Sequence, residues 1–91
     1  MRLYVYTFVS EDKEKEIIEN EVFCDFSKAS NKLMEEYNNC LKNMDLLNEE
    51  DTGYTHNIKI NSKSESIRAY VTDDLTGETC VWTINSLDAN L

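Results

Sequence analysis

Only one stretch of this sequence has helical periodicity, and that feature constrains the fold more than any other. Between residues 26 and 44, apolar side chains recur at spacings of three and four, as on one stripe of an amphipathic helix. The stripe consists of Phe26, Ala29, Leu33, Tyr37, Cys40, Leu41 and Met44. The pattern predicts a helix from about Lys28 to Met44, with Ser27 as its N-cap. A lone amphipathic helix must bury its stripe against another layer, and a sheet is the simplest one.

The segments before the helix alternate in the manner of β-strands. Residues 2–9 are rich in β-branched and aromatic side chains and are apolar on both faces, which predicts a strand inside the sheet. Residues 16–24 predict a second strand that forms a hairpin with the first. The polar pair Glu19 and Asn20 interrupts its apolar residues, and we expect a bulge there.

The segments after the helix alternate again. Residues 56–61, 66–72 and 79–85 predict three further strands. Residues 73–78 have the composition of a hairpin loop, in which Gly77 supplies a positive φ. We expect residues 86–91 to form a short, loosely held tail.

The predicted order is β-β-α-β-β-β, which belongs to the α+β class. We expect an antiparallel sheet of about five strands with one helix packed on one face and the other face partly open to water. The chain has 91 residues, which is the length of a single small domain.

The aromatic residues of the first strand allow two interpretations. Tyr4, Tyr6 and Phe8 share one face of that strand, and Tyr70 would share it if its strand pairs nearby. Core packing beneath the helix is the favoured interpretation, because aromatic side chains dominate small cores. If the helix covers the opposite face, Tyr4, Tyr6 and Tyr70 instead form an exposed patch that binds a protein partner. Trp82 is expected in the core in either case.

The chain is strongly acidic, and this restricts its partners. It carries 9 Lys and Arg against 18 Asp and Glu, and 9 − 18 gives a net charge of −9. Such a surface repels the phosphates of nucleic acid and anionic lipid, so neither direct nucleic-acid binding nor membrane binding is expected. A basic protein surface is the complementary partner.

The carboxylates are clustered along the chain. The candidate partner-binding set contains Glu11, Asp12, Glu14, Glu16, Glu19 and Glu21 in one cluster and Asp73, Asp74 and Glu78 in another. A further acidic run occupies residues 49–51. In extended conformation, Asp12, Glu14 and Glu16 would lie about 6.6 Å apart on one side of a strand. Such a row resembles a phosphate track and would fit a basic groove built for nucleic acid. The alternative is that these carboxylates are solvated loop residues that keep a small domain soluble.

Catalytic and cofactor motifs are missing, so we expect no enzyme, no cofactor and no metal. His56 is the one histidine, and nothing in the sequence pairs it with a thiol as a nucleophile would require. Cys24, Cys40 and Cys80 lack the close spacing of a zinc site and are interpreted as core thiols of a reduced, cytoplasmic protein. The two glycines are isolated, so no phosphate-binding loop is present.

Four features of the chain are typical of a known group of proteins: its length, its acidity, the opening Met1-Arg2-Leu3-Tyr4-Val5-Tyr6-Thr7 strand and the single helix between hairpins. In these features the chain resembles the small acidic proteins of phages and other mobile elements, including some anti-CRISPR inhibitors. The resemblance implies an inhibitor that acts by occupying its target.

The leading hypothesis is therefore a non-catalytic inhibitor that binds a basic nucleic-acid-handling enzyme, such as a CRISPR effector or another nuclease, as a nucleic-acid mimic. An immunity protein or antitoxin against a basic toxin would use the same electrostatics. A self-assembling structural protein of phage origin, for instance a dimer, is a third possibility.

Overall fold

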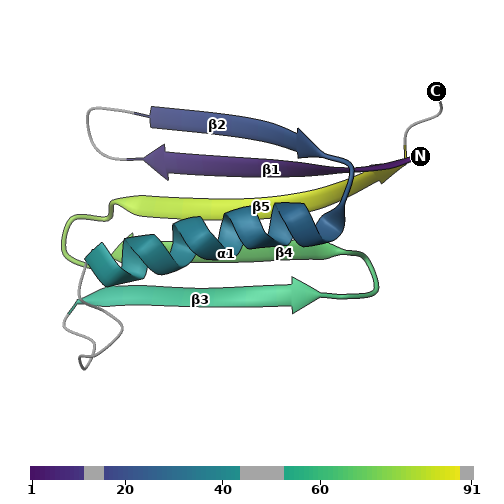
Figure 1. Ribbon diagram of the computed structural model, residues 1–91. Helices are drawn as coiled ribbons and strands as arrows, with labels where there is room; N and C mark the ends of the chain where they lie inside the picture. The colour runs from purple at the N-terminus through teal and green to yellow at the C-terminus, as the bar shows by residue number, and fades with distance from the viewer. Residues whose placement is uncertain (12–15, 44–52, 89–91) are drawn as a thin grey trace.

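The computed structural model describes residues 1–11, 16–43 and 53–88 of the chain. Within them, five strands and one helix follow in the predicted order, with the helix across one face of an antiparallel sheet (Figure 1). The elements are β1 (Arg2–Glu11), β2 (Glu16–Phe23), α1 (Phe26–Asn43), β3 (Tyr54–Asn61), β4 (Ser66–Asp73) and β5 (Thr79–Asp88). The α+β prediction is confirmed. Asp12, Glu14, Met44 and the acidic run 49–51 lie outside the described residues.

The sheet has the strand order β2-β1-β5-β4-β3, so β1 is an internal strand, as its two apolar faces predict. The expected bulge in β2 is wrong. Every residue of β2 has one partner in β1, and Glu19 pairs with Phe8 and Asn20 with Thr7. β2 is an edge strand whose side chains are almost all exposed. Polar residues therefore fit its regular alternation, and no bulge is needed to redirect them.

The last strand is longer than predicted. Ser86, Leu87 and Asp88 were expected in the tail but extend β5 along the beginning of β1. Alternation alone could not predict this extension, because it depends on the length of the neighbouring strand.

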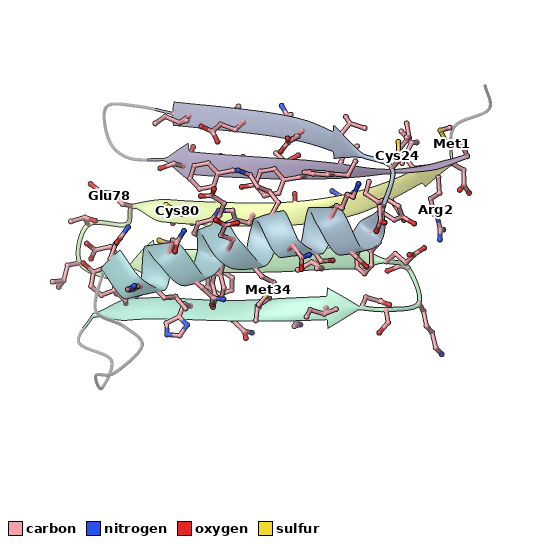
Figure 2. All side chains as sticks on the ribbon, viewed as in Figure 1. Met1, Arg2, Cys24, Met34, Glu78 and Cys80 are labelled. Atoms are coloured by element: carbon pink, nitrogen blue, oxygen red, sulfur yellow. The ribbon has the colours of Figure 1, made fainter. Side chains whose placement is uncertain are left out.

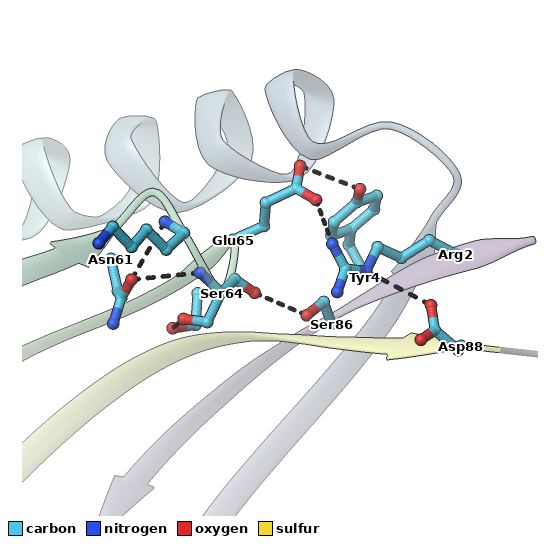
Figure 3. Close-up of polar contacts among 9 residues, drawn as sticks. Arg2, Tyr4, Asn61, Ser64, Glu65, Ser86 and Asp88 are labelled. Atoms are coloured by element: carbon cyan, nitrogen blue, oxygen red, sulfur yellow. Dashed lines mark hydrogen bonds and ion pairs between the residues drawn. The ribbon is translucent and has the colours of Figure 1, made fainter.

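The β3–β4 turn is tied to this end of the sheet by polar contacts (Figure 3). Glu65 accepts hydrogen bonds from Arg2 at 2.6 Å and from the Tyr4 hydroxyl at 3.1 Å. Ser86 donates a hydrogen bond to the backbone carbonyl of Ser64 at 2.7 Å. Glu65 adopts a φ of 51°, which is uncommon for a residue with a side chain, and its two contacts help to hold that conformation.

Asp25, and not Ser27, caps the helix. The Asp25 carboxylate accepts a hydrogen bond from the Ser27 backbone amide at 2.7 Å. Its backbone carbonyl accepts one from the Ala29 amide at 3.2 Å. The N-cap prediction was therefore wrong by two residues: Ser27 already lies inside α1, and an aspartate is an equally good cap.

The core lies between α1 and the sheet. It consists of Tyr4, Tyr6, Ala29, Leu33, Tyr37, Leu41, Ile67, Ala69, Val71, Trp82 and Ile84. Trp82, expected in the core, packs edge-on against Tyr37, with ring centroids 5.6 Å apart. It also packs against Phe8 in a tilted arrangement, with ring centroids 5.2 Å apart. Phe26, the first residue of the helix stripe, packs against Tyr4 with ring centroids 5.5 Å apart. Aromatic pairs of this kind contribute about 0.5–1.5 kcal/mol each beyond their burial.

The β4–β5 loop follows its prediction. Gly77 has a φ of 79°, and its amide donates a hydrogen bond to the Asp73 carbonyl at 2.8 Å. A residue with a Cβ would be strained at this position, which explains the glycine.

Candidate protein-binding surface

The hairpin register brings Glu11 and Glu16 together as cross-strand partners where β1 ends and β2 begins. On the other side of Glu11 lies Thr79, which directly follows Glu78. The β4–β5 loop therefore lies at the same end of the sheet as these two glutamates (Figure 1). We call the carboxylates gathered there the acidic end: Glu11, Glu16, Asp73, Asp74 and Glu78.

No ion pair neutralises the acidic end within residues 1–11, 16–43 and 53–88. The ion pairs found there join Arg2 to Glu65 and Asp88, and Lys32 to Glu36. Glu11, Glu16 and Glu78 are exposed. Carboxylates without an ion-pair partner among these described residues create a negative potential that attracts a basic surface.

Asp73 and Asp74 have structural roles within the acidic end. The Asp73 carboxylate accepts a hydrogen bond from the Leu75 amide at 2.9 Å and so shapes the loop. The Asp74 carboxylate accepts one from the Thr55 hydroxyl at 2.9 Å and ties the loop to β3. These contacts fix the positions of both side chains within the acidic end.

A second acidic feature lies between the edge strand β2 and α1. Glu19 and Glu21 pair with Phe8 and Tyr6, so their side chains project on the same face of the sheet as the helix. Two adjoining pockets of about 400 and 420 Å³ open there, and Glu19 and Tyr6 line both. Glu36 of α1 lines one pocket and Glu21 the other. We call this feature the acidic groove: Glu19, Glu21 and Glu36 around Tyr6.

The acidic groove already holds an ammonium group of the protein itself. Lys32 donates a hydrogen bond to Glu36 at 3.0 Å, which raises the pKa of Lys32, and its Nζ lies 5.9 Å from the centre of the Tyr6 ring. Burial raises the pKa of Tyr6 to about 12, and the charge of Glu36 adds to the shift. A carboxylate and an aromatic face together form a favourable site for a Lys or Arg side chain.

Glu36 was not among the candidate residues. Its sequence position on the polar side of the helix stripe gives no sign that it faces Glu19. Glu36 and Glu19 line one pocket because α1 packs beside β2, whose side chains stay exposed.

The described members of the first acidic cluster do not form one ridge. Glu16 projects on the open face of the sheet, whereas Glu19 and Glu21 project on the helix face, because side chains alternate along β2. Asp12 and Glu14 lie outside the described residues, so the predicted row of Asp12, Glu14 and Glu16 stays a prediction. The first cluster thus divides between the acidic end and the acidic groove.

The exposed aromatic patch is wrong, and the core interpretation of the first strand is confirmed. Tyr4 and Tyr6 are 7% and 2% exposed, because the helix packs on their face. Tyr70 is half-buried and projects on the opposite face, since it pairs with Val81 in β5 while Ala69 pairs with Trp82. The helix covers the aromatic face because that face offers the larger apolar area.

The open face of the sheet has two halves. Over β2, β1 and β5 it mixes apolar with polar residues, and Ile18, Val22 and Leu87 are each more than half exposed. Over β4 and β3 it is polar and basic, because Arg68 and Lys59 are direct cross-strand partners. The cation pair lies away from the acidic end.

The titratable groups considered for catalysis do not converge. His56 Nδ1 lies 3.3 Å from the Tyr37 hydroxyl, and His56 does not line the pocket that Cys40 and Cys80 share. The core interpretation of Cys24 is wrong: it is exposed in the β2–α1 connection, far along the sheet from Cys80 (Figure 2). In the described part of the chain, no group of three His, Cys, Asp or Glu side chains is placed to hold a metal ion.

The helix in the described ranges is not of the long, apolar kind that crosses a membrane. No protein-family model matches this chain, and the comparison with curated proteins gave no significant match.

Proposed function

We propose that this protein is a non-catalytic inhibitor that occupies the nucleic-acid-binding surface of a basic enzyme, with a CRISPR effector nuclease as the representative target. The observation that carries the proposal is the pairing of Glu11 with Glu16 beside Glu78 at one end of the sheet, with no ion pair to a cation among the described residues. This arrangement retains mutual repulsion in the free protein. A basic partner would relieve that repulsion on binding.

The acidic groove extends the proposed interface along β2. Its carboxylate Glu36 already binds the Lys32 ammonium, which is the chemistry needed for an arginine or lysine of the partner. β2 also presents an unpaired strand edge, to which an extended segment of a partner can add. In this proposal the acidic end accelerates association and the groove contributes most of the specific contacts.

The proposed interface revises the residues expected from sequence. Glu11, Glu16, Glu19, Glu21 and Glu78 remain, Asp73 and Asp74 act mainly by shaping the loop, and Glu36 is added. Tyr4 and Tyr6 act from the core and are no longer proposed as exposed contacts. Asp12 and Glu14 stay in the proposal on their sequence position alone.

The experiment is competition for a guide-loaded CRISPR effector nuclease. The protein is added before or after target DNA, and cleavage is measured. Occupation of the DNA-binding surface predicts strong inhibition when the protein is added first and weak inhibition when DNA is already bound. Equal inhibition in both orders would contradict occupation of that surface, and no binding across a panel of basic nucleases would reject the proposal.

An immunity protein or antitoxin remains an alternative that uses the same surface. The two are separated by the partner: rescue of cells from a basic toxin, with no effect on any CRISPR effector, would favour the antitoxin.

Self-assembly is a second candidate, favoured by the exposed apolar residues Ile18, Val22 and Leu87 on the open face. Two such faces could pack together as in a sandwich. Sedimentation tests it directly: a dimer that dissociates in the Val22→Lys variant supports this function, and a monomer at high concentration rejects it.

A further inference from the structure

Two thiols from distant parts of the chain lie close together near the C-terminal end of α1. Cys40 lies in the last part of α1, between the buried residues Tyr37 and Leu41. Cys80 is the second residue of β5 and projects on the helix face, like Trp82. Both side chains line one pocket, together with Trp82. The pocket brings the end of the helix and the beginning of the last strand together.

Reagents can reach the pair from solution. Both cysteines are only partly buried, and both line the pocket of about 400 Å³ that belongs to the acidic groove. Figure 2 shows Cys80 beside the helix. The pair therefore differs from ordinary core thiols, which are inert because nothing reaches them.

The interaction between the two thiols makes the two sulfurs unequal. It lowers the pKa of Cys80 and raises that of Cys40 above its usual range. The Ser10 hydroxyl lies 3.7 Å from the Cys80 sulfur and stabilises its negative charge further. Burial and the charge of Glu78 oppose this effect but do not cancel it. Cys80 is therefore the better nucleophile of the two at neutral pH.

We propose that Cys40 and Cys80 form a reactive dithiol site that exchanges with small disulfides and closes an internal disulfide between α1 and β5. The Cys80 thiolate attacks one sulfur of the reagent, a mixed disulfide forms, and the other half leaves as a thiolate that takes up a proton. Cys40 then loses its proton and attacks the Cys80 sulfur, and the second half of the reagent leaves in the same way. One disulfide is reduced to two thiols, and the protein dithiol is oxidised to one disulfide.

The charge around the pocket selects among reagents. Glu19 of β2 and Glu36 of α1 line it, and Glu78 lies before β5. These carboxylates attract cations and repel anions. A cationic disulfide such as cystamine should therefore react faster than the anionic disulfide of glutathione, and the difference should shrink at high salt.

The test uses the full chain with Cys24→Ser, so that the exposed third thiol does not react. The folded protein is treated with cystamine at pH 7, quenched with acid, and analysed by mass spectrometry and non-reducing peptide mapping. The expected product is a Cys40–Cys80 disulfide with no cysteamine retained. Persistence of two free thiols until denaturant is added, or accumulation of a mixed disulfide that never closes, would overturn the proposal.

Single variants in the same background identify the attacking thiol. Cys40→Ser removes the second thiol, so Cys80 should retain one cysteamine as a stable mixed disulfide. Cys80→Ser leaves Cys40 alone and should react at least tenfold more slowly. Equal rates for the two variants would contradict the assigned roles, and circular dichroism establishes that each variant is folded. If a variant does not fold, the peptide mapping of the Cys24→Ser chain still tests whether the Cys40–Cys80 disulfide forms.

Discussion

Glu11 and Glu16 face each other as direct cross-strand partners in the β1–β2 hairpin. Like charges directly opposite each other destabilise a sheet. Folding does not require two glutamates at this position, because an exposed hairpin end tolerates many residue types. This repulsion destabilises the free protein, and the proposed cationic partner would relieve it. This relationship is the physical basis of the proposed interface.

The first prediction concerns the stability of this pair. Glu11→Gln with Glu16→Gln should raise the free energy of unfolding by about 0.2–1 kcal/mol at low salt, because repulsion across the hairpin is removed. Urea denaturation measures it, and the gain should decrease at high salt. A loss of stability would show that these carboxylates make favourable contacts instead.

The second prediction distinguishes the observed helix cap from the one expected from sequence. Asp25→Ala should destabilise the protein by about 1 kcal/mol, because the Ser27 amide loses its acceptor. Ser27→Ala is the matched control and should have a much smaller effect. Thermal unfolding measures the stability of the two variants. A larger loss in Ser27→Ala than in Asp25→Ala would show that Ser27 is the cap.

This result also shows how far the sequence could predict the fold. The helix stripe and the alternating segments follow from periodicity, which depends only on neighbours in the chain. The exact cap does not, because Asp25 and Ser27 are both good caps and lie two residues apart. The extension of β5 to Asp88 depends on its partner strand, which local sequence does not specify.

The candidate site was predictable to a similar extent. Acidic clusters are visible in the sequence, and Glu11 and Glu16 meet once the two strands form a hairpin. The acidic groove was not predictable, because it depends on β2 lying at the sheet edge beyond the cover of the helix. The dithiol was missed for the same reason: Cys40 and Cys80 meet only after α1 packs on β5.

The third prediction concerns alkaline pH. The pKa of Tyr6 is raised to about 12 in the folded protein from an ordinary value of 10.0. A raised tyrosine pKa means that the folded state holds its proton more tightly, so this contribution to stability is complete below pH 10 and is lost as the pH rises towards 12.

Urea denaturation across that range should therefore show a decrease in the free energy of unfolding. Tyr6→Phe should show a smaller decrease, because it removes one of the shifted groups. Tyr37, whose pKa burial also raises, remains in the variant and prevents complete loss of the effect. An identical pH dependence in the variant would contradict the role of Tyr6.

The fourth prediction concerns the cation pair on the open face. Arg68→Thr should raise the free energy of unfolding by about 0.2–1 kcal/mol, because Lys59 and Arg68 are like charges in direct register. Threonine also favours strands. Lys28→Thr, on the exposed side of α1, is a control with the same change in charge. A loss of stability in Arg68→Thr beyond that of the control would mean that the arginine makes a compensating contact.

The most direct test of the central claim compares two charge-matched double variants in binding to the basic nuclease. Glu11→Gln with Glu16→Gln changes the acidic end, and Glu35→Gln with Asp88→Asn removes the same charge elsewhere. The account predicts at least tenfold weaker affinity and a reduced salt dependence for the first variant, and near wild-type values for the second. Equal affinities for the two variants would show that only net charge matters, and the acidic end would then have no specific role.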